Sequence, residues 1–253
     1  MRPNLVLPFH DPEGHLLRHL QQIAPVLKER FDRAFLSISP PTERYQQDRL
    51  RALRTGSFFQ LNANPPGTQA GEHYLTAYQQ AVAQSATEQT LHLCDIDKVA
   101  YALQSEHSAQ FLDDIATVTR ANTPLLFQRS AAAWATYPAI YRELEQMAIR
   151  IGELYFGRYF DFAWSYLIIE ARQLAQLLPH IHCRDFGLLP ELLLLLRDQL
   201  QTQEVDWLAW EDPFILQRDA AALRAERDSD PEETHKRLLW NKAVLAQVLA
   251  AIQ

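Results

Sequence analysis

The chain has 253 residues, of which 47% are hydrophobic, 10% are aromatic and 22% are charged. This composition provides enough apolar material for one or at most two packed domains, and it excludes an intrinsically disordered or low-complexity chain. The formal net charge of −7 argues against nucleic-acid binding as the main function. No apolar run, 192–196 included, exceeds five residues, which is far too short for a transmembrane segment.

The two cysteines, Cys94 and Cys183, lie far apart in the sequence. Their number excludes a disulfide framework and a zinc site built from cysteines. The N-terminus has no apolar segment followed by a small-residue cleavage site, so we expect no secretory signal. A reducing, cytoplasmic environment is therefore the expectation.

The first hundred residues alternate strand and helix patterns. Short apolar runs bounded by turn residues predict strands at 5–7, 33–39, 57–61 and 90–94. Apolar residues at helical spacing and a capping Thr42 predict intervening helices at 16–27, 42–53 and 74–81. This order predicts an α/β fold in which helices flank a mostly parallel central sheet. Such sheets bind ligands at the carboxyl ends of their strands.

The second half is richer in helix patterns. Apolar stripes predict helices at 140–154, 167–178, 188–200 and from 230 to the C-terminus, while residues 204–210 alternate as a strand does. The sequence shows no internal repeat and no flexible linker. We therefore expect one domain over 1–253, in which a half of alternating strands and helices gives way to a helix-rich half near residue 115.

The pair Asp95-x-Asp97 comes directly after the predicted strand 90–94. Two carboxylates at that position can share a cation such as Mg²⁺ or Mn²⁺ and bind a diphosphate through it. A D-x-D pair alone is common, and two acids in a solvated turn are the alternative. The position at the end of a fourth parallel strand favours the functional interpretation.

Three segments resemble the GT-A fold nucleotide-sugar glycosyltransferases, of the mannosylglycerate-synthase-like pattern in the nucleotide-diphospho-sugar transferase superfamily. They are 4–20 (NLVLPFHDPEGHLLRHL), 67–81 (GTQAGEHYLTAYQQA) and 91–97 (LHLCDID). The resemblance covers about the first 115 residues, and it implies a nucleotide-binding half at 1–115 and an acceptor half at 116–253. It also implies a Mn²⁺- or Mg²⁺-dependent transfer of a sugar from a nucleotide-diphospho-sugar donor to a small or soluble acceptor.

The resemblance further implies roles for individual residues at the strand ends. Those that would border the base and ribose are Pro8, Phe9, His10, Ser39, Asn62 and Asn64. Gly71 would open the helix before the D-x-D strand. Asp95 would contact the ribose and the metal, and Asp97 would contact the metal and the diphosphate.

In the second half the resemblance rests on position more than on motif. It makes Asp185 or Glu191 the candidate general base on an acceptor hydroxyl, although a helix cap and a polar helix face explain them as well. His235 is the candidate third metal ligand, although its surroundings are typical of an exposed first helical turn. Residues 210–213 (WEDP) suit either sugar binding or a helix cap at Asp212.

The sequence departs from the family in its basic residues. It has no lysine or arginine between Arg54 and Lys98, where the family often places one close to the diphosphate. This departure leaves three alternatives. A basic residue from elsewhere supplies the positive charge near the diphosphate, the metal alone neutralises the diphosphate, or diphosphate binding is weaker. Lys98 either compensates for this missing positive charge or forms an ion pair.

The alternative function is therefore that of a non-catalytic nucleotide- or sugar-binding protein on the same fold. A nucleotidyltransferase ranks last, because residues 9–14 contain no basic residue beyond histidine.

Three other patterns have weaker functional interpretations. His15 and His19 have the i, i+4 spacing of a zinc site, and residues 180–183 (HIHC) gather three metal-binding side chains. The aromatic segment 155–166 suits an acceptor pocket, a homo-oligomer contact or, as the default, core packing.

Overall fold

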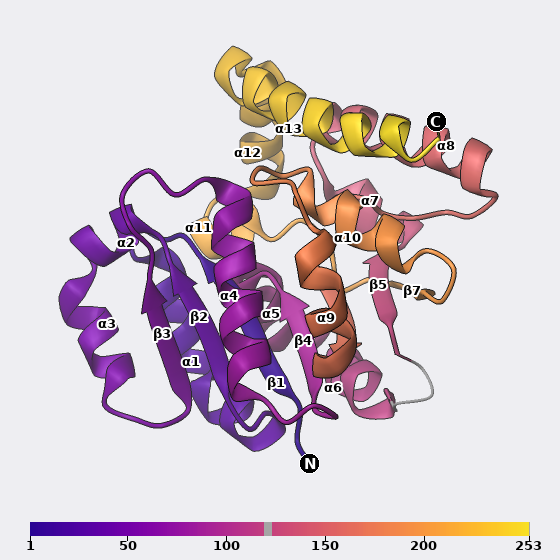
Figure 1. The fold of residues 1–253 in the computed structure, drawn as a ribbon. Helices are drawn as coiled ribbons and strands as arrows, with labels where there is room; N and C mark the ends of the chain where they lie inside the picture. The colour runs from indigo at the N-terminus through magenta and orange to yellow at the C-terminus, as the bar shows by residue number, and fades with distance from the viewer. Residues whose placement is uncertain (119–122, 253) are drawn as a thin grey trace.

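One seven-stranded sheet runs through the molecule in the computed structural model, which describes residues 1–118 and 123–252 (Figure 1). Its strands are β1 (Asn4–Phe9), β2 (Ala34–Ile38), β3 (Phe59–Ala63), β4 (Thr90–Cys94), β5 (Leu125–Arg129), β6 (Tyr166–Glu170) and β7 (Gln201–Val205). Their order across the sheet is β3-β2-β1-β4-β6-β5-β7. Only β6 is antiparallel to its neighbours among these strands. The predicted mostly parallel sheet is confirmed.

Helices cover both faces of the sheet because both faces of its central strands are apolar. Along β1, Val6 packs in one hydrophobic cluster while Leu5 and Leu7 pack in another, as the alternation of side chains across a strand requires. The first cluster lies under α4 (Ala70–Gln84), α9 (Ala171–Leu177) and α10 (Leu188–Leu196). The second lies under α1 (His15–Arg30), α5 (Ile96–Gln104) and α6 (Ser108–Thr117).

Two long helices lie across the carboxyl ends of the parallel strands. These are α8 (Ala139–Phe156) and α13 (Pro231–Ala250), which pack against each other at the top of Figure 1 together with α12 (Ala220–Ser229). The remaining short helical elements are α2 (Pro40–Tyr45), α3 (Gln47–Arg54), α7 (Ala131–Thr136), η2 (Leu178–His180) and α11 (Asp212–Leu216). No helix in the described part of the chain is long and apolar enough to cross a membrane.

Several predicted elements need correction. The predicted helix 167–178 is wrong in its first part, because Leu167 belongs to β6 and the helix α9 begins at Ala171. The predicted strand 204–210 is displaced, since β7 ends at Val205. The predicted helix 42–53 is divided into α2 and α3, which meet at Gln46. The predicted boundary near residue 115 between the two halves falls inside α6. The division into a nucleotide-binding half and an acceptor half therefore stays a prediction about function.

Gly71 allows the start of α4 to approach the segment before α10. A Cβ at this position would lie 2.4 Å from the carbonyl oxygen of Asp185 and 2.6 Å from the carbonyl carbon of Arg184. Because both contacts are backbone atoms, they cannot rotate away. We expect Gly71→Ala to lower the free energy of unfolding in urea by about 1–3 kcal/mol. Gly56→Ala is the matched control, because a Cβ there meets nothing within 4 Å; equal stability of the two variants would contradict the prediction.

Candidate active site

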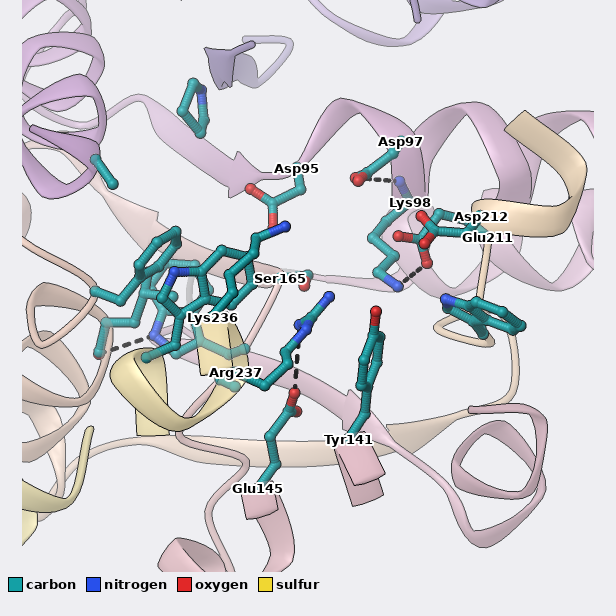
Figure 2. Close-up of a pocket in the computed structure, with 18 of the residues that line it drawn as sticks. Asp95, Asp97, Lys98, Tyr141, Glu145, Ser165, Glu211, Asp212, Lys236 and Arg237 are labelled. Carbon is teal, nitrogen blue, oxygen red and sulfur yellow. Dashed lines mark hydrogen bonds and ion pairs between the residues drawn. The ribbon is translucent and has the colours of Figure 1, made fainter. Parts of the chain in front are cut away.

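A cavity of about 740 Å³ opens at the carboxyl ends of β1 and β4 (Figure 2). Its walls come from the start of α4, from α8 and α13, and from the segments before β6 and after β7. Residues from both ends of the chain therefore meet in one site. Open α/β sheets bind their ligands at this position.

The acidic pair lies in the wall of this cavity. Asp95 is the extended residue between β4 and α5, and Asp97 lies in the first turn of α5. The hydroxyl of Tyr74 donates a hydrogen bond to the Asp95 carboxylate at 3.0 Å. The backbone N–H of Lys98 donates to the Asp97 carboxylate at 2.8 Å. Both carboxylates are half-buried.

Burial raises the pKa of the Asp95 carboxyl to about 6, against the opposing effects of the Tyr74 hydrogen bond and the Lys98 charge. Burial, followed by the charge of Asp95, raises the pKa of Asp97 to about 6 as well. Two carboxylates that raise each other's energy when ionised favour a divalent cation between them. Mg²⁺ is commonly held by one or two carboxylates together with substrate phosphates.

The residues present therefore fit a Mn²⁺ or Mg²⁺ ion whose other ligands are diphosphate oxygens and water. The part of the chain that the structure describes contains no group of three or more histidines, cysteines and acids arranged to hold a metal by themselves. His235, the predicted third ligand, is exposed on α13 and does not line the cavity. The prediction for His235 is therefore not supported by its position.

Lys98 forms a buried ion pair with Glu211, not with the acidic pair. Its Nζ also donates to the hydroxyl of Tyr137 at 2.6 Å and lies 3.4 Å from the carbonyl oxygen of Ala209. Burial lowers the pKa of the Lys98 ammonium, but the Glu211 carboxylate outweighs this effect and raises it. The pair fastens the start of α5 to the segment after β7, as Figure 2 shows.

Residues 210–212 line the same cavity. Asp212 is the first residue of α11, and the N-cap position is occupied by Glu211, so the predicted helix cap at Asp212 is displaced by one residue. Its carboxylate lies 3.6 Å from the guanidinium of Arg227. Burial, and then the charge of Glu211, raises the pKa of Asp212.

Basic residues enter the cavity from α12 and α13, which the sequence patterns did not indicate. Arg227, Lys236 and Arg237 all line it. The Arg237 guanidinium lies 3.6 Å from the centre of the Tyr141 ring. Lys236 is held loosely, with its side chain 51% exposed and its Nζ 3.6 Å from the Glu233 carboxylate. In Figure 2 its side chain extends toward Asp95.

The end of β1 brings Pro8, Phe9 and His10 to the cavity wall. The His10 Nδ1 lies 2.9 Å from the Ser39 hydroxyl, which accepts a hydrogen bond from the N–H of Thr42 and caps α2. Ser39 therefore contacts His10 from behind and does not line the cavity itself.

The other residues assigned to the nucleotide site lie farther from the wall. The Asn64 amide is buried and donates to the Ser37 hydroxyl at 2.6 Å. Asn62 is exposed and Gly71 packs on the 184–185 backbone, and neither lines the cavity.

Asp185 and Glu191 do not line the cavity either. The Asp185 carboxylate accepts a hydrogen bond from the N–H of Gly187 at 2.9 Å, just before α10. The Glu191 carboxylate accepts from the N–H groups of His182 and Cys183, each at 2.9 Å. These contacts give both acids a structural role, so their positions do not support the predicted catalytic role.

The structure also gives structural contacts to residues of the three weaker patterns, which are the histidine pair, residues 180–183 and the aromatic segment 155–166. His19 is buried, and its Nδ1 lies 3.3 Å from the Gln104 amide oxygen. Residues 182 and 183 bind Glu191 through their backbone, as described above. In the aromatic segment Phe160, Phe162 and Trp164 are buried in the core, and the last two also line the cavity.

Comparisons with known proteins give matches in structure and not in sequence. No family model matches the chain, and no curated protein matches it. Glucosyl-3-phosphoglycerate synthase from Mycobacterium tuberculosis in complex with UDP matches with a TM-score of 0.56 and 14% identity, over 99% of this chain and 80% of that one. The same enzyme with Mn²⁺, UDP-glucose and glycerol 3-phosphate matches with a TM-score of 0.55 and 13% identity, over the same shares. The chain therefore has the GT-A fold of the nucleotide-sugar glycosyltransferases, as its three resembling segments imply.

Proposed function

We propose that this protein is a metal-dependent glycosyltransferase that transfers a sugar from a nucleotide-diphospho-sugar to a small acceptor. The observation that carries the proposal is the Asp95–Asp97 pair in the wall of the cavity at the carboxyl end of β4. The matching fold occurs in an enzyme solved with Mn²⁺ and UDP-glucose, which supports the same donor chemistry.

In this proposal residues of the first half bind the donor. We assign the nucleoside to residues 8–10 and the diphosphate to Asp95 and Asp97, all of which line the cavity. Tyr74 orients the Asp95 carboxylate, and the Lys98–Glu211 pair holds the start of α5. When bound, the cation neutralises charge on the leaving diphosphate.

We place the acceptor on the other side of the cavity, below α8 and α13. Among the acids that line the cavity, Asp212 has a loosely held partner, the Arg227 guanidinium at 3.6 Å. We assign Asp212 the role of receiving the proton of the acceptor hydroxyl, in place of Asp185 and Glu191. A general base at this point is required where the reaction inverts the anomeric configuration.

A thermal-shift panel tests the proposal directly. Nucleoside diphosphates and nucleotide sugars are each added with Mn²⁺ or with EDTA, and the donors that bind are then incubated with acceptors for mass spectrometry. We expect one nucleotide to raise the unfolding midpoint with Mn²⁺ but not with EDTA, because a ligand that binds the folded state stabilises it. Donor binding without transfer would favour the non-catalytic alternative, and no metal-dependent binding would overturn the proposal.

Lys236 is the residue that we expect to supply the positive charge missing between Arg54 and Lys98. Lys236→Met should weaken Mn²⁺-dependent binding of the nucleoside diphosphate about tenfold, as expected for the loss of one charge-assisted hydrogen bond. Isothermal titration calorimetry measures this change. Lys242→Ala is the control, because Lys242 is exposed on the same helix and does not line the cavity. Equal affinities of the two variants would contradict this role.

A further inference from the structure

The cations at the acceptor end are already matched by carboxylates of the chain. Arg129 donates two hydrogen bonds of 2.6 Å to Asp161 and lies 2.7 Å from Glu145. The Arg237 Nε donates to Glu233 at 2.9 Å, and its guanidinium lies 3.7 Å from Glu145. Both arginines are therefore paired with carboxylates of the chain, and they offer little unpaired positive charge to a ligand.

The same holds for the other basic residues of the wall. Arg227 lies between Asp212 at 3.6 Å and Glu233 at 3.5 Å, and Lys98 is paired with Glu211. The cavity is lined by five lysines and arginines and by six aspartates and glutamates. Two of these acids, Asp95 and Asp97, belong to the proposed metal site, and Lys236 is assigned to the donor diphosphate. The remaining four acids match the remaining four cations, so a phosphorylated acceptor would add negative charge to a wall whose cations are already matched.

The acceptor end also offers aromatic surfaces. The rings of Phe186 and Trp240 lie with their centres 4.3 Å apart, and both line the cavity. Cations cover part of this surface, since Arg237 lies over the Tyr141 ring, and Lys236 and Arg237 lie 4.7 and 4.5 Å from the centre of the Trp240 ring. Leu189 and Val244 complete an apolar wall. Aromatic and aliphatic walls with a few polar groups suit a compact organic ligand with an apolar face, such as the C–H face of a sugar ring.

Asn241 adds one polar group to this wall. It lies on α13, it is 5% exposed, and it lines the cavity. Its side-chain oxygen is buried and has no hydrogen-bond partner among residues 1–118 and 123–252. Buried polar atoms without a partner are rare in folded proteins and call for an explanation. An amide oxygen accepts a hydrogen bond, which a hydroxyl can donate and an ionised phosphate or carboxylate cannot.

We propose that the acceptor is a neutral polyhydroxylated molecule, a sugar or polyol, and that Asn241 recognises one of its hydroxyl groups. This inference rests on the proposed function. In the reaction the acceptor hydroxyl oxygen bonds to the anomeric carbon, the bond from that carbon to the diphosphate breaks, and its electron pair leaves with the nucleoside diphosphate. The hydroxyl proton goes to a carboxylate of the cavity.

Matched pairs of acceptors test this assignment with the full chain, Mn²⁺ and the donor identified by thermal shift. The pairs are glycerol and glycerol 3-phosphate, glucose and glucose 6-phosphate, and mannose and mannose 6-phosphate. We expect the kcat/KM of the best neutral member to exceed that of its phosphate by at least about tenfold, because only the neutral member donates a hydroxyl hydrogen bond without adding negative charge. A faster phosphorylated member would overturn the inference.

Binding without a donor separates this result from failure of the proposed function. Saturation-transfer NMR with the same pairs requires no turnover and no nucleotide. A neutral sugar or polyol that binds more tightly than its phosphate supports the acceptor assignment even if no donor shift is found. No binding of any neutral member, or tighter binding of the phosphates, overturns it.

Asn241→Leu tests the residue itself with a side chain of similar size. We expect the KM for the neutral acceptor to rise about tenfold while donor affinity stays unchanged. The midpoint of thermal unfolding should stay equal or rise, because the substitution removes a buried amide whose oxygen has no partner in the described chain. Lys242→Ala is again the control. A lower midpoint together with an unchanged acceptor KM would show a structural role and overturn the assignment.

Discussion

An Asp97→Ala variant should lose metal-dependent nucleotide binding and transfer sugar about 10²–10³-fold more slowly than the wild type, the scale seen when a preorganised group at developing charge is removed. The Asp97 carboxylate accepts one backbone hydrogen bond and otherwise faces the cavity beside Asp95. Without it, a cation shared with the diphosphate loses one of its two protein ligands. Initial rates and calorimetric titrations with Mn²⁺ measure both effects.

Stability provides the check on this variant. Because burial and Asp95 both raise the energy of the ionised Asp97 carboxylate, its removal should not lower the midpoint of thermal unfolding. Asp185→Ala is the matched acid control, because Asp185 lies outside the cavity and caps the segment before α10. That variant should keep metal-dependent nucleotide binding. Similar binding losses in both variants would contradict the assignment of Asp97.

Lys98→Met should lower the free energy of unfolding by about 3–5 kcal/mol, the range found when one partner of a buried ion pair is removed. The side chains of Lys98 and Glu211 are 7% and 9% exposed. Loss of the ammonium leaves the Glu211 carboxylate buried without its main counter-charge, and it removes the hydrogen bond to Tyr137. Urea unfolding followed by circular dichroism measures the change.

The double variant Lys98→Met/Glu211→Leu distinguishes the ion pair from simple packing. Replacement of both charges by apolar side chains of similar size removes the uncompensated charge, so the double variant should be more stable than Lys98→Met alone. A double-mutant cycle gives the interaction energy of the pair. Strictly additive effects would contradict the coupling that we infer.

The first half of the fold was predictable because its signals are local. Pro40 follows β2 closely, and the nearly continuous burial of β1 and β2 follows from their continuous apolar sequence. The predicted ends of two strands are early, because β1 continues through Pro8 to Phe9 and β3 continues to Ala63. The β6 segment YLIIE was not recognised, since a short apolar run followed by a helical stripe does not reveal its own period. Its strand state depends on pairing with β4 and β5, which lie far from it in the sequence.

The site likewise contains residues that local sequence signals reveal and residues that depend on the packing of distant segments. Asp95 and Asp97 are visible in the sequence because they directly follow a strand. Lys236 and Arg237 are not, because their place in the cavity depends on how α13 crosses the sheet. The prediction selected His235 on this helix, and one residue along a helix turns the side chain by about 100°. His235 therefore faces solvent while its two successors face the cavity.

The antiparallel strand β6 has a consequence for how the chain folds. Strand β5 precedes β6 in the sequence but pairs beyond it, so β4 has β1 as its sole neighbour until β6 arrives. Until then β4 is an open edge whose residues 91–94 are buried in the finished sheet. Exposed apolar edges pair readily with other chains, and sheet pairing between distant segments is slow. Refolding yield should therefore fall as protein concentration rises, because intermolecular pairing at β4 competes with the arrival of β6.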